Sequence, residues 1–166
     1  MYNSIQEVTE DLLNEAYLTQ KVLEALSDAS LAQPSAAGHR TLGELAWHLV
    51  TAHGAILGEA GLKFEAPVEE VVPASAAELA ESYKKASEAA VSAIKSQWTD
   101  ATLQESRNMW GMMEFTVPGL IAMFIRHQAH HRGQLTVLMR LAGLKVPGVY
   151  GPSQEEWAAM GAGAGQ

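Results

Sequence analysis

The 166-residue chain contains no cysteine. Disulfide bonds, a cysteine nucleophile and zinc or iron-sulfur sites with cysteine ligands are therefore excluded, which leaves histidine, aspartate and glutamate as the side chains able to bind a metal. A cytoplasmic localisation is compatible with this composition.

Long apolar runs and basic clusters are also absent. No stretch of 18 or more apolar residues occurs, and the amino terminus MYNSIQEVTEDLL opens with acidic residues instead of a basic segment followed by an apolar one. We therefore expect a soluble protein with neither a membrane span nor a signal peptide. The formal net charge is -8 and the longest basic run is Lys84-Lys85, so we expect no nucleic-acid partner and no membrane partner.

Several catalytic motifs are missing as well. The sequence has no His-Glu-x-x-His of zincin proteases and no Glu-x-x-His of carboxylate-rich di-iron bundles. It also lacks Gly-x-Ser-x-Gly, a P-loop and GxGxxG. A serine nucleophile or a nucleotide cofactor would have to be present without its usual signature.

What the sequence does contain is helical periodicity. Apolar residues recur with the helical period in four segments, residues 4–26, 42–59, 75–98 and 118–143. Capping boxes formed by Thr41 with Glu44 and by Ser75 with Glu78 mark the starts of the second and third segments. Connectors at residues 27–40 and 60–74 are rich in small residues, glycine and proline. Four such helices with long connectors predict an all-α four-helix bundle, a single domain over residues 1–160.

Two smaller elements are expected near the fourth helix. Between residues 99 and 116 the helical period fails, and two short extended pieces around Trp110-Gly111 indicate a small hairpin. Ser153 and Glu156 would cap a short helix over residues 154–160, and residues 161–166 are expected to form a frayed tail.

The helix expected over residues 118–143 carries a pair of histidines. Projecting the apolar stripe of Leu120, Phe124, Leu138 and Leu141 at about 100° per residue puts His127, His131 and Gln134 on the same line. His127 and His131 are about 40° apart around the axis and about 6 Å apart along it, which is a spacing suited to metal ligands. His130 lies about 60° from His127 and about 100° from His131, so it cannot bind the same ion and is expected either to contact a ligand residue or to be exposed to solvent.

His48 on the second helix lies at the edge of that helix's apolar stripe and would point into the bundle. If it meets His127 and His131, three imidazoles can bind a Zn, Ni, Fe or Cu ion and leave a position open for water or substrate. The ion would lower the pKa of a bound water, activate a thiol as thiolate or polarise a carbonyl, and the sequence does not choose among these roles. Glu44, one turn before His48, is placed to orient that ligand, although its capping box already explains it.

Histidines in a helical bundle do not always bind a metal. A single histidine on an apolar face is usually a core residue with a satisfied hydrogen bond, and His39 and His53 are not expected to bind a metal. Burying the pair on the fourth helix without partners would cost a few kcal/mol, which favours a ligand role for those two. A bundle whose histidines bind nothing, serving as an interaction module, is the other reading.

A second face of the helix over residues 42–59 has little side-chain bulk, since it contains Gly43, Trp47, Val50, Gly54 and Gly58. Glycine in a helix interior costs roughly 1 kcal/mol relative to alanine. One prediction is that the three glycines allow close packing against a neighbouring segment or against a second subunit, and the second case would make the protein a homodimer. The other is that they only make the helix loosely specified.

Three stretches resemble the DinB/YfiT-like family: AWHLV with His48, HQAHHRGQL with His127 and His131, and MRLAGLKVPGVYGPS. The resemblance implies a four-helix bundle in which a metal, commonly nickel or zinc, is held by one histidine of the second helix and two of the fourth, here His48, His127 and His131. Some members resemble transferases or isomerases that use a low-molecular-weight thiol such as bacillithiol, mycothiol or glutathione.

The functional expectation is therefore an enzyme whose three-His divalent-metal site activates water or a low-molecular-weight thiol toward a small substrate, as in a hydrolase or a thiol S-transferase. Loops at residues 110–114 and 149–153 would shape its pocket. The alternative is a non-catalytic metal-binding or stress-response bundle in which the ion stabilises the fold or is stored. No aspartate, glutamate or tyrosine is singled out as a general acid or base.

Overall fold

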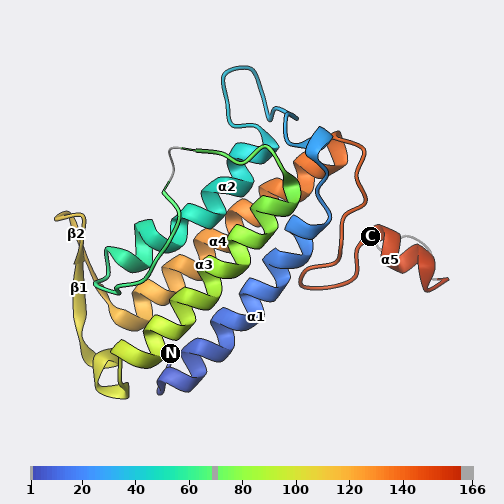
Figure 1. The fold of residues 1–166 in the computed structure, drawn as a ribbon. Helices are drawn as coiled ribbons and strands as arrows, with labels where there is room; N and C mark the ends of the chain where they lie inside the picture. The colour runs from blue at the N-terminus through green and yellow to red at the C-terminus, as the bar shows by residue number, and fades with distance from the viewer. Residues whose placement is uncertain (1, 69–70, 162–166) are drawn as a thin grey trace.

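Four long helices lie side by side in the computed structural model, which describes residues 2–68 and 71–161 (Figure 1). They are α1 (Ile5–Glu24), α2 (Leu42–Ala52), α3 (Ala76–Gln97) and α4 (Val117–Leu141). The shorter elements are two strands, β1 (Ser106–Met109) and β2 (Met113–Thr116), and the helix α5 (Gln154–Ala159). The predicted four-helix bundle is confirmed, together with the hairpin and the last short helix. From residue 162 on, the expected tail lies outside the described residues.

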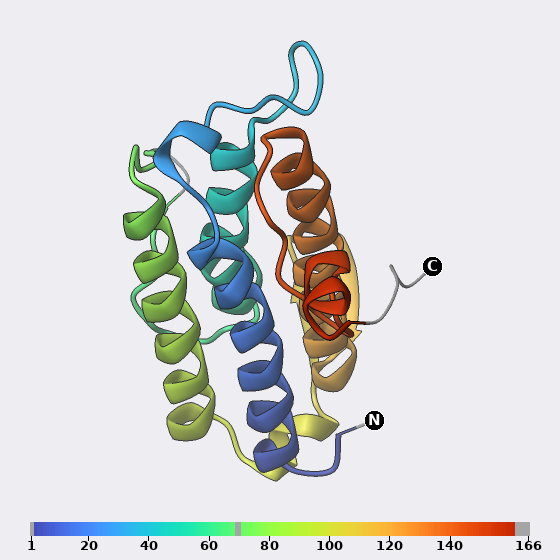
Figure 2. The same ribbon diagram turned by 90° about the vertical axis from the view of Figure 1, so that its right-hand side faces the viewer.

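The helices do not simply alternate in direction. α1 and α4 run one way along the bundle, and α2 and α3 run the other way (Figures 1 and 2). The connector between α2 and α3 therefore has to return along the length of the bundle, which explains why it is long. This arrangement places α2 antiparallel beside α4, so residues from the middle of the two helices face each other.

The second helix begins where predicted and then changes its winding. The Thr41 side chain accepts a hydrogen bond from the Glu44 N–H, while the Glu44 carboxylate accepts one from the Thr41 N–H at 2.7 Å. After Ala52 the chain continues as a π-helical turn, η2 (His53–Gly58), instead of the regular helix expected to residue 59. Such turns are uncommon and occur often near functional sites.

The buried stripe of α4 differs from the predicted one. Leu141 is 62% exposed and Gln134 is also exposed, whereas Gln128 and Arg132 are buried. The prediction used apolar residues alone. It missed Gln128 and Arg132 because buried amide and guanidinium groups are rare unless they are paired. The histidine pair therefore lies at the edge of the buried face of α4 and not at its centre.

Two of the three glycines on the second helix do allow close packing. A Cβ on Gly43 would lie 3.1 Å from the Leu31 Cβ, and one on Gly54 would lie 2.9 Å from the Ala66 Cβ, while one on Gly58 would have nothing within 4 Å. The neighbours are connector residues of the same chain. Close packing at Gly43 and Gly54 is thus explained without a second subunit, and the homodimer stays a prediction that these glycines no longer support.

The remaining segments directly precede and follow α4 in the chain. The hairpin of β1 and β2 stands beside the start of α4, and its turn contains Trp110 at φ 54° followed by Gly111 at φ 68° (Figure 1). Beyond α4 the chain turns at Gly143, with φ 74°, and runs back to α5 (Figure 2). Among the described residues, no helix has both the length and the apolarity needed to cross a membrane.

Candidate metal centre

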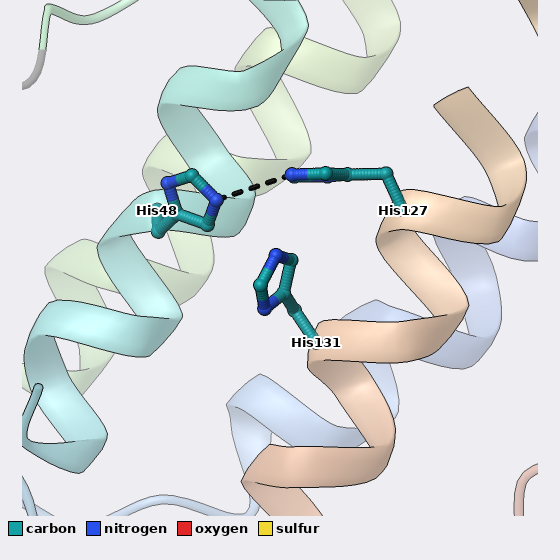
Figure 3. Close-up of side chains that lie close together, drawn as sticks. All are labelled: His48, His127 and His131. Atoms are coloured by element: carbon teal, nitrogen blue, oxygen red, sulfur yellow. Dashed lines mark hydrogen bonds between the residues drawn. The ribbon is translucent and has the colours of Figure 1, made fainter. Parts of the chain in front are cut away.

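Three histidines from two helices converge between α2 and α4. His48 projects from α2 toward His127 and His131 on α4 (Figure 3). The Nε2 atoms of His48 and His127 are 3.1 Å apart, and one ligand nitrogen from each of the three rings lies within 4.8 Å of the others. The ring centres of His127 and His131 are 4.4 Å apart, and that of His131 is 4.6 Å from that of His48. The structure thus brings together the three side chains selected from the sequence.

Packing on either side of the cluster holds the two helices at this separation. Leu45 and Leu49 of α2 and Leu135 and Leu138 of α4 are buried in the same hydrophobic core. These residues lie within about two turns of the histidines, so the backbone that carries the rings is fixed by core contacts. The rings themselves are half-buried, because they sit where the seam between the helices opens to solvent.

Burial keeps two of the three rings neutral. Loss of solvation, together with the smaller effect of the neighbouring rings of His131 and His48, lowers the pKa of His127 to about 4. Burial also lowers the pKa of His131, against an opposing effect of its hydrogen bond with Gln134. Neutral imidazoles have a free lone pair at pH 7, which is the form that binds a metal ion.

Gln134 determines which nitrogen of His131 has the lone pair. The Gln134 side-chain amide donates to His130 Nε2 at 3.0 Å, and its Oε1 lies 2.8 Å from His131 Nδ1. Because an amide oxygen only accepts, His131 Nδ1–H must be the donor, and the lone pair of His131 is therefore on Nε2. This is the arrangement of outer ligands that commonly orients metal-binding histidines.

The donor set fits a divalent metal ion. Two imidazole nitrogens that bind one tetrahedral ion at about 2.0–2.1 Å lie about 3.3 Å apart, close to the separation of the His48 and His127 Nε2 atoms. Without an ion, a single N–H could bridge these two atoms, and His127 Nδ1 is buried with no hydrogen-bond partner among the described residues. The group contains no fourth histidine, aspartate or glutamate from the described part of the chain. A set of three histidine nitrogens is typical of a catalytic site with an open position.

The other histidines and Glu44 have different surroundings. His130 is exposed and reaches the cluster only through Gln134 and an edge contact with the His131 ring. His53 is buried elsewhere, with Nδ1 3.1 Å from the Val50 carbonyl oxygen, and it is not part of the cluster. The exposed Glu44 carboxylate accepts from the Thr41 N–H, which is the capping role that its position predicted.

An open groove of about 590 Å³ adjoins the cluster at His131 and Gln134. It is lined by the end of the connector before α2 and by the last turns of α4. The two loops that were expected to shape the pocket do not line this groove. The Trp110 N–H donates to the Glu59 carboxylate, and the Tyr150 hydroxyl donates to the carboxylate of Glu15 on α1. The sequence offered no sign that the connector before α2 would fold beside the histidines.

A buried ion pair on another face of α4 was not predicted from the sequence. Arg132 has a side chain that is 1% exposed, and it donates to the Glu15 carboxylate at 2.8 Å and to the Thr19 hydroxyl at 2.9 Å. It also donates to the Tyr150 hydroxyl. The Glu15 side chain is only 14% exposed. These contacts attach α4 and the segment after it to α1.

Two known proteins are similar to this chain along most of its length. YrdA of Bacillus subtilis (strain 168), described as uncharacterized, is 48% identical over 162 residues, which cover 97% of this chain and 96% of YrdA. The crystal structure of a DinB-like protein from Bacillus cereus ATCC 10987 has a TM-score of 0.86 and 46% identity, covering 90% of this chain and 100% of that chain.

A more distant structure shares the fold alone. YfiT from Bacillus subtilis, described as a probable metal-dependent hydrolase with an unusual four-helix bundle topology, has a TM-score of 0.62 and 16% identity, covering 85% of this chain and 89% of its own. The model of the DinB family matches residues 1–164. With a relative nearly half identical along almost its whole length, and with the bundle and its three histidines in place, this chain belongs to the DinB family.

Proposed function

We propose that this DinB-family protein is a metalloenzyme in which His48, His127 and His131 bind one divalent ion, nickel or zinc, to act on a small substrate. The observation that carries the proposal is the convergence of three imidazole nitrogens within 4.8 Å of one another at the seam of two helices. A divalent ion bound there supplies Lewis-acid chemistry, which lowers the pKa of a water or a thiol bound next to it.

Residues around the site support the binding of the ion and of a substrate. The low pKa of His127, about 4, keeps this ligand deprotonated throughout the neutral range. Gln134 holds His131 with its lone pair on Nε2. The groove beside His131 supplies a binding surface of a size typical for small-molecule sites, which are about 300–1,000 Å³.

Two reaction types are proposed for such a site. Water activation would make the protein a hydrolase, the type of activity given in the description of YfiT. Thiol activation would make it a transferase, and because the chain has no cysteine, the thiol would come from a low-molecular-weight cosubstrate. Turnover of an activated ester without thiol supports hydrolysis, whereas turnover of an electrophilic aromatic halide only with added thiol supports transfer.

The openness of the site favours an enzyme over an ion store. Structural zinc sites are closed by four protein ligands, whereas this group contains three and adjoins an open groove. The alternative, a non-catalytic metal-binding or stress-response bundle, would be favoured by bound metal without turnover of any water- or thiol-dependent substrate.

The first test is the metal content of protein produced without a His tag and without added metal. The parent is compared with a His127→Ala plus His131→Ala variant by elemental analysis and by thermal shift on adding nickel or zinc. About one ion per chain is expected in the parent, because the described residues contain a single three-His set, and none in the variant.

His39→Ala is the matched control. His39 is an exposed histidine that is not part of the cluster, so this variant should retain the parent's metal content. Parent protein without metal, and with no thermal shift on adding either ion, would refute the metalloenzyme proposal. Equal metal content in the parent and the double variant would show that the ion binds elsewhere.

A further inference from the structure

The groove beside the histidines has walls of two different chemical kinds. One wall is the last part of α4, where Val137 and Leu141 are 60% and 62% exposed. These residues are four apart, so their side chains lie on the same side of the helix one turn from each other. Single exposed apolar residues are ordinary, but a pair lining one groove forms a continuous apolar strip.

The other wall is polar and cationic. It comes from the end of the connector before α2 and includes Ser35, His39 and Arg40. Among the described residues, no aspartate or glutamate lines the groove, although acidic residues outnumber basic ones 19 to 11 in the full sequence. A guanidinium is charged at every physiological pH and has a planar set of donors that matches carboxylates.

This wall is held in a defined conformation. The Arg40 carbonyl accepts hydrogen bonds from the Ser35 N–H at 3.3 Å and from the Ser35 hydroxyl at 2.9 Å. The His39 N–H donates to the Ala36 carbonyl at 3.1 Å, and the capping box at Thr41 follows at once. The backbone that carries Arg40 is therefore fixed next to the start of α2, above which the connector rises in Figure 1.

The groove leads directly to the metal ligands. His131 and Gln134 line the same groove as Arg40 and Leu141. Arg40 is also close enough for its charge to lower the pKa of His127 and His131. A ligand in the groove would thus touch an apolar strip, the Arg40 side chain and the edge of the histidine cluster together.

We infer that the groove binds a small amphiphilic anion, whose anionic group lies against Arg40 and whose apolar body lies along Val137 and Leu141. Its reactive end then lies at the histidine cluster. This inference rests on the proposed function and names its substrate class: a small apolar molecule with an anionic end is selected over its uncharged analogue.

The test compares two thiols that differ only at the far end, 6-mercaptohexanoate and 6-mercaptohexan-1-ol. Each is titrated into cobalt-loaded protein, in which thiolate binding to the ion gives an absorption band. We expect the acid to bind about fivefold more tightly than the alcohol, the upper end for a solvent-accessible ion pair of about 1 kcal/mol. Hexanoate and hexan-1-ol are compared by calorimetry as a readout that does not use the metal.

Variants assign the preference to one side chain. In Arg40→Gln the acid and the alcohol should bind equally, with the affinity for the alcohol unchanged, and Arg40→Lys should recover part of the preference. Lys85→Gln removes the same charge from α3, at an exposed lysine paired with Glu81, and should leave the preference intact.

The outcomes separate the two proposals. Equal bands and equal affinities for both thiols in the parent would overturn the anion preference while leaving metal and thiol binding standing. An acid preference that persists in Arg40→Gln would have the same consequence. No band with either thiol would refute thiol activation at the metal. The calorimetric pair would then decide the anion preference by itself, since hexanoate must still bind more tightly than hexan-1-ol if the inference is right.

Discussion

Replacing Arg132 with methionine should destabilise the protein strongly although Arg132 is outside the metal centre. Its guanidinium is 1% exposed and donates to the Glu15 carboxylate, the Thr19 hydroxyl and the Tyr150 hydroxyl. Methionine is unbranched and fills most of the same space, so the main effect is the loss of the positive charge. Glu15 is then left as a nearly buried carboxylate without its cation.

The magnitude follows from what remains around Glu15. Breaking a buried ion pair by removing one partner costs about 3–5 kcal/mol. Glu15 keeps the Tyr150 hydroxyl as a donor at 2.8 Å, and its side chain is 14% exposed, so the low end of that range applies. We expect a loss of about 3 kcal/mol in the free energy of unfolding, or about 6–12 °C in Tm for a chain of this size.

The assay is urea unfolding followed by helical circular dichroism on metal-free protein, for the parent, Arg132→Met, Glu15→Met and the double variant. Replacing a buried ion pair by apolar residues of similar volume is often neutral or stabilising. The double variant should therefore be more stable than Arg132→Met alone. Metal content of the folded variants provides a second readout, since Arg132 helps to fix α4, which carries His127 and His131.

Two results would refute this reasoning. A cost below about 1 kcal/mol for Arg132→Met would mean that the pair is effectively solvated, as exposed ion pairs are. A double variant whose loss equals the sum of the two single losses would mean that Arg132 and Glu15 do not interact energetically, because independent sites add.

Two further predictions concern single side chains. Gln134→Leu should weaken metal binding about tenfold or more while leaving the helical signal unchanged, because outer partners of ligating histidines typically contribute 10–100-fold and Gln134 is exposed. Metal titration with a competing chelator measures this, and an unchanged affinity would contradict the orienting role. Burial lowers the pKa of His53 from 6.5 to about 4, so between these pH values the unfolded chain binds more protons than the folded one. The metal-free protein should therefore lose stability as the pH falls from 6.5 to 4. The effect of His53 amounts to about 3 kcal/mol. Urea unfolding at several pH values should show a shallower loss in His53→Asn, and an equal slope in both proteins would contradict the assignment.

Local sequence signals predicted the helices well because they act over one or two turns. The Thr41 capping box occurs at the predicted start of the second helix, and the left-handed Gly143 is the residue at which the fourth was predicted to end. Their hydrogen bonds join residues three or four apart, so no tertiary information is needed to find them. The exception is the π-helical turn from His53 to Gly58, where the periodic pattern continued but the winding did not.

The sequence by itself determined the four amphipathic helices and selected His48, His127 and His131, because helical spacing alone puts two imidazoles on one turn and a third on the inner edge of another helix. Only the tertiary structure decided the surroundings of these three histidines. The burial of Arg132, the bridge made by Gln134 and the groove beside Arg40 depend on contacts between segments far apart in the chain. Such contacts leave no periodic trace in a sequence, since each partner's residue type is explained equally well by an exposed position.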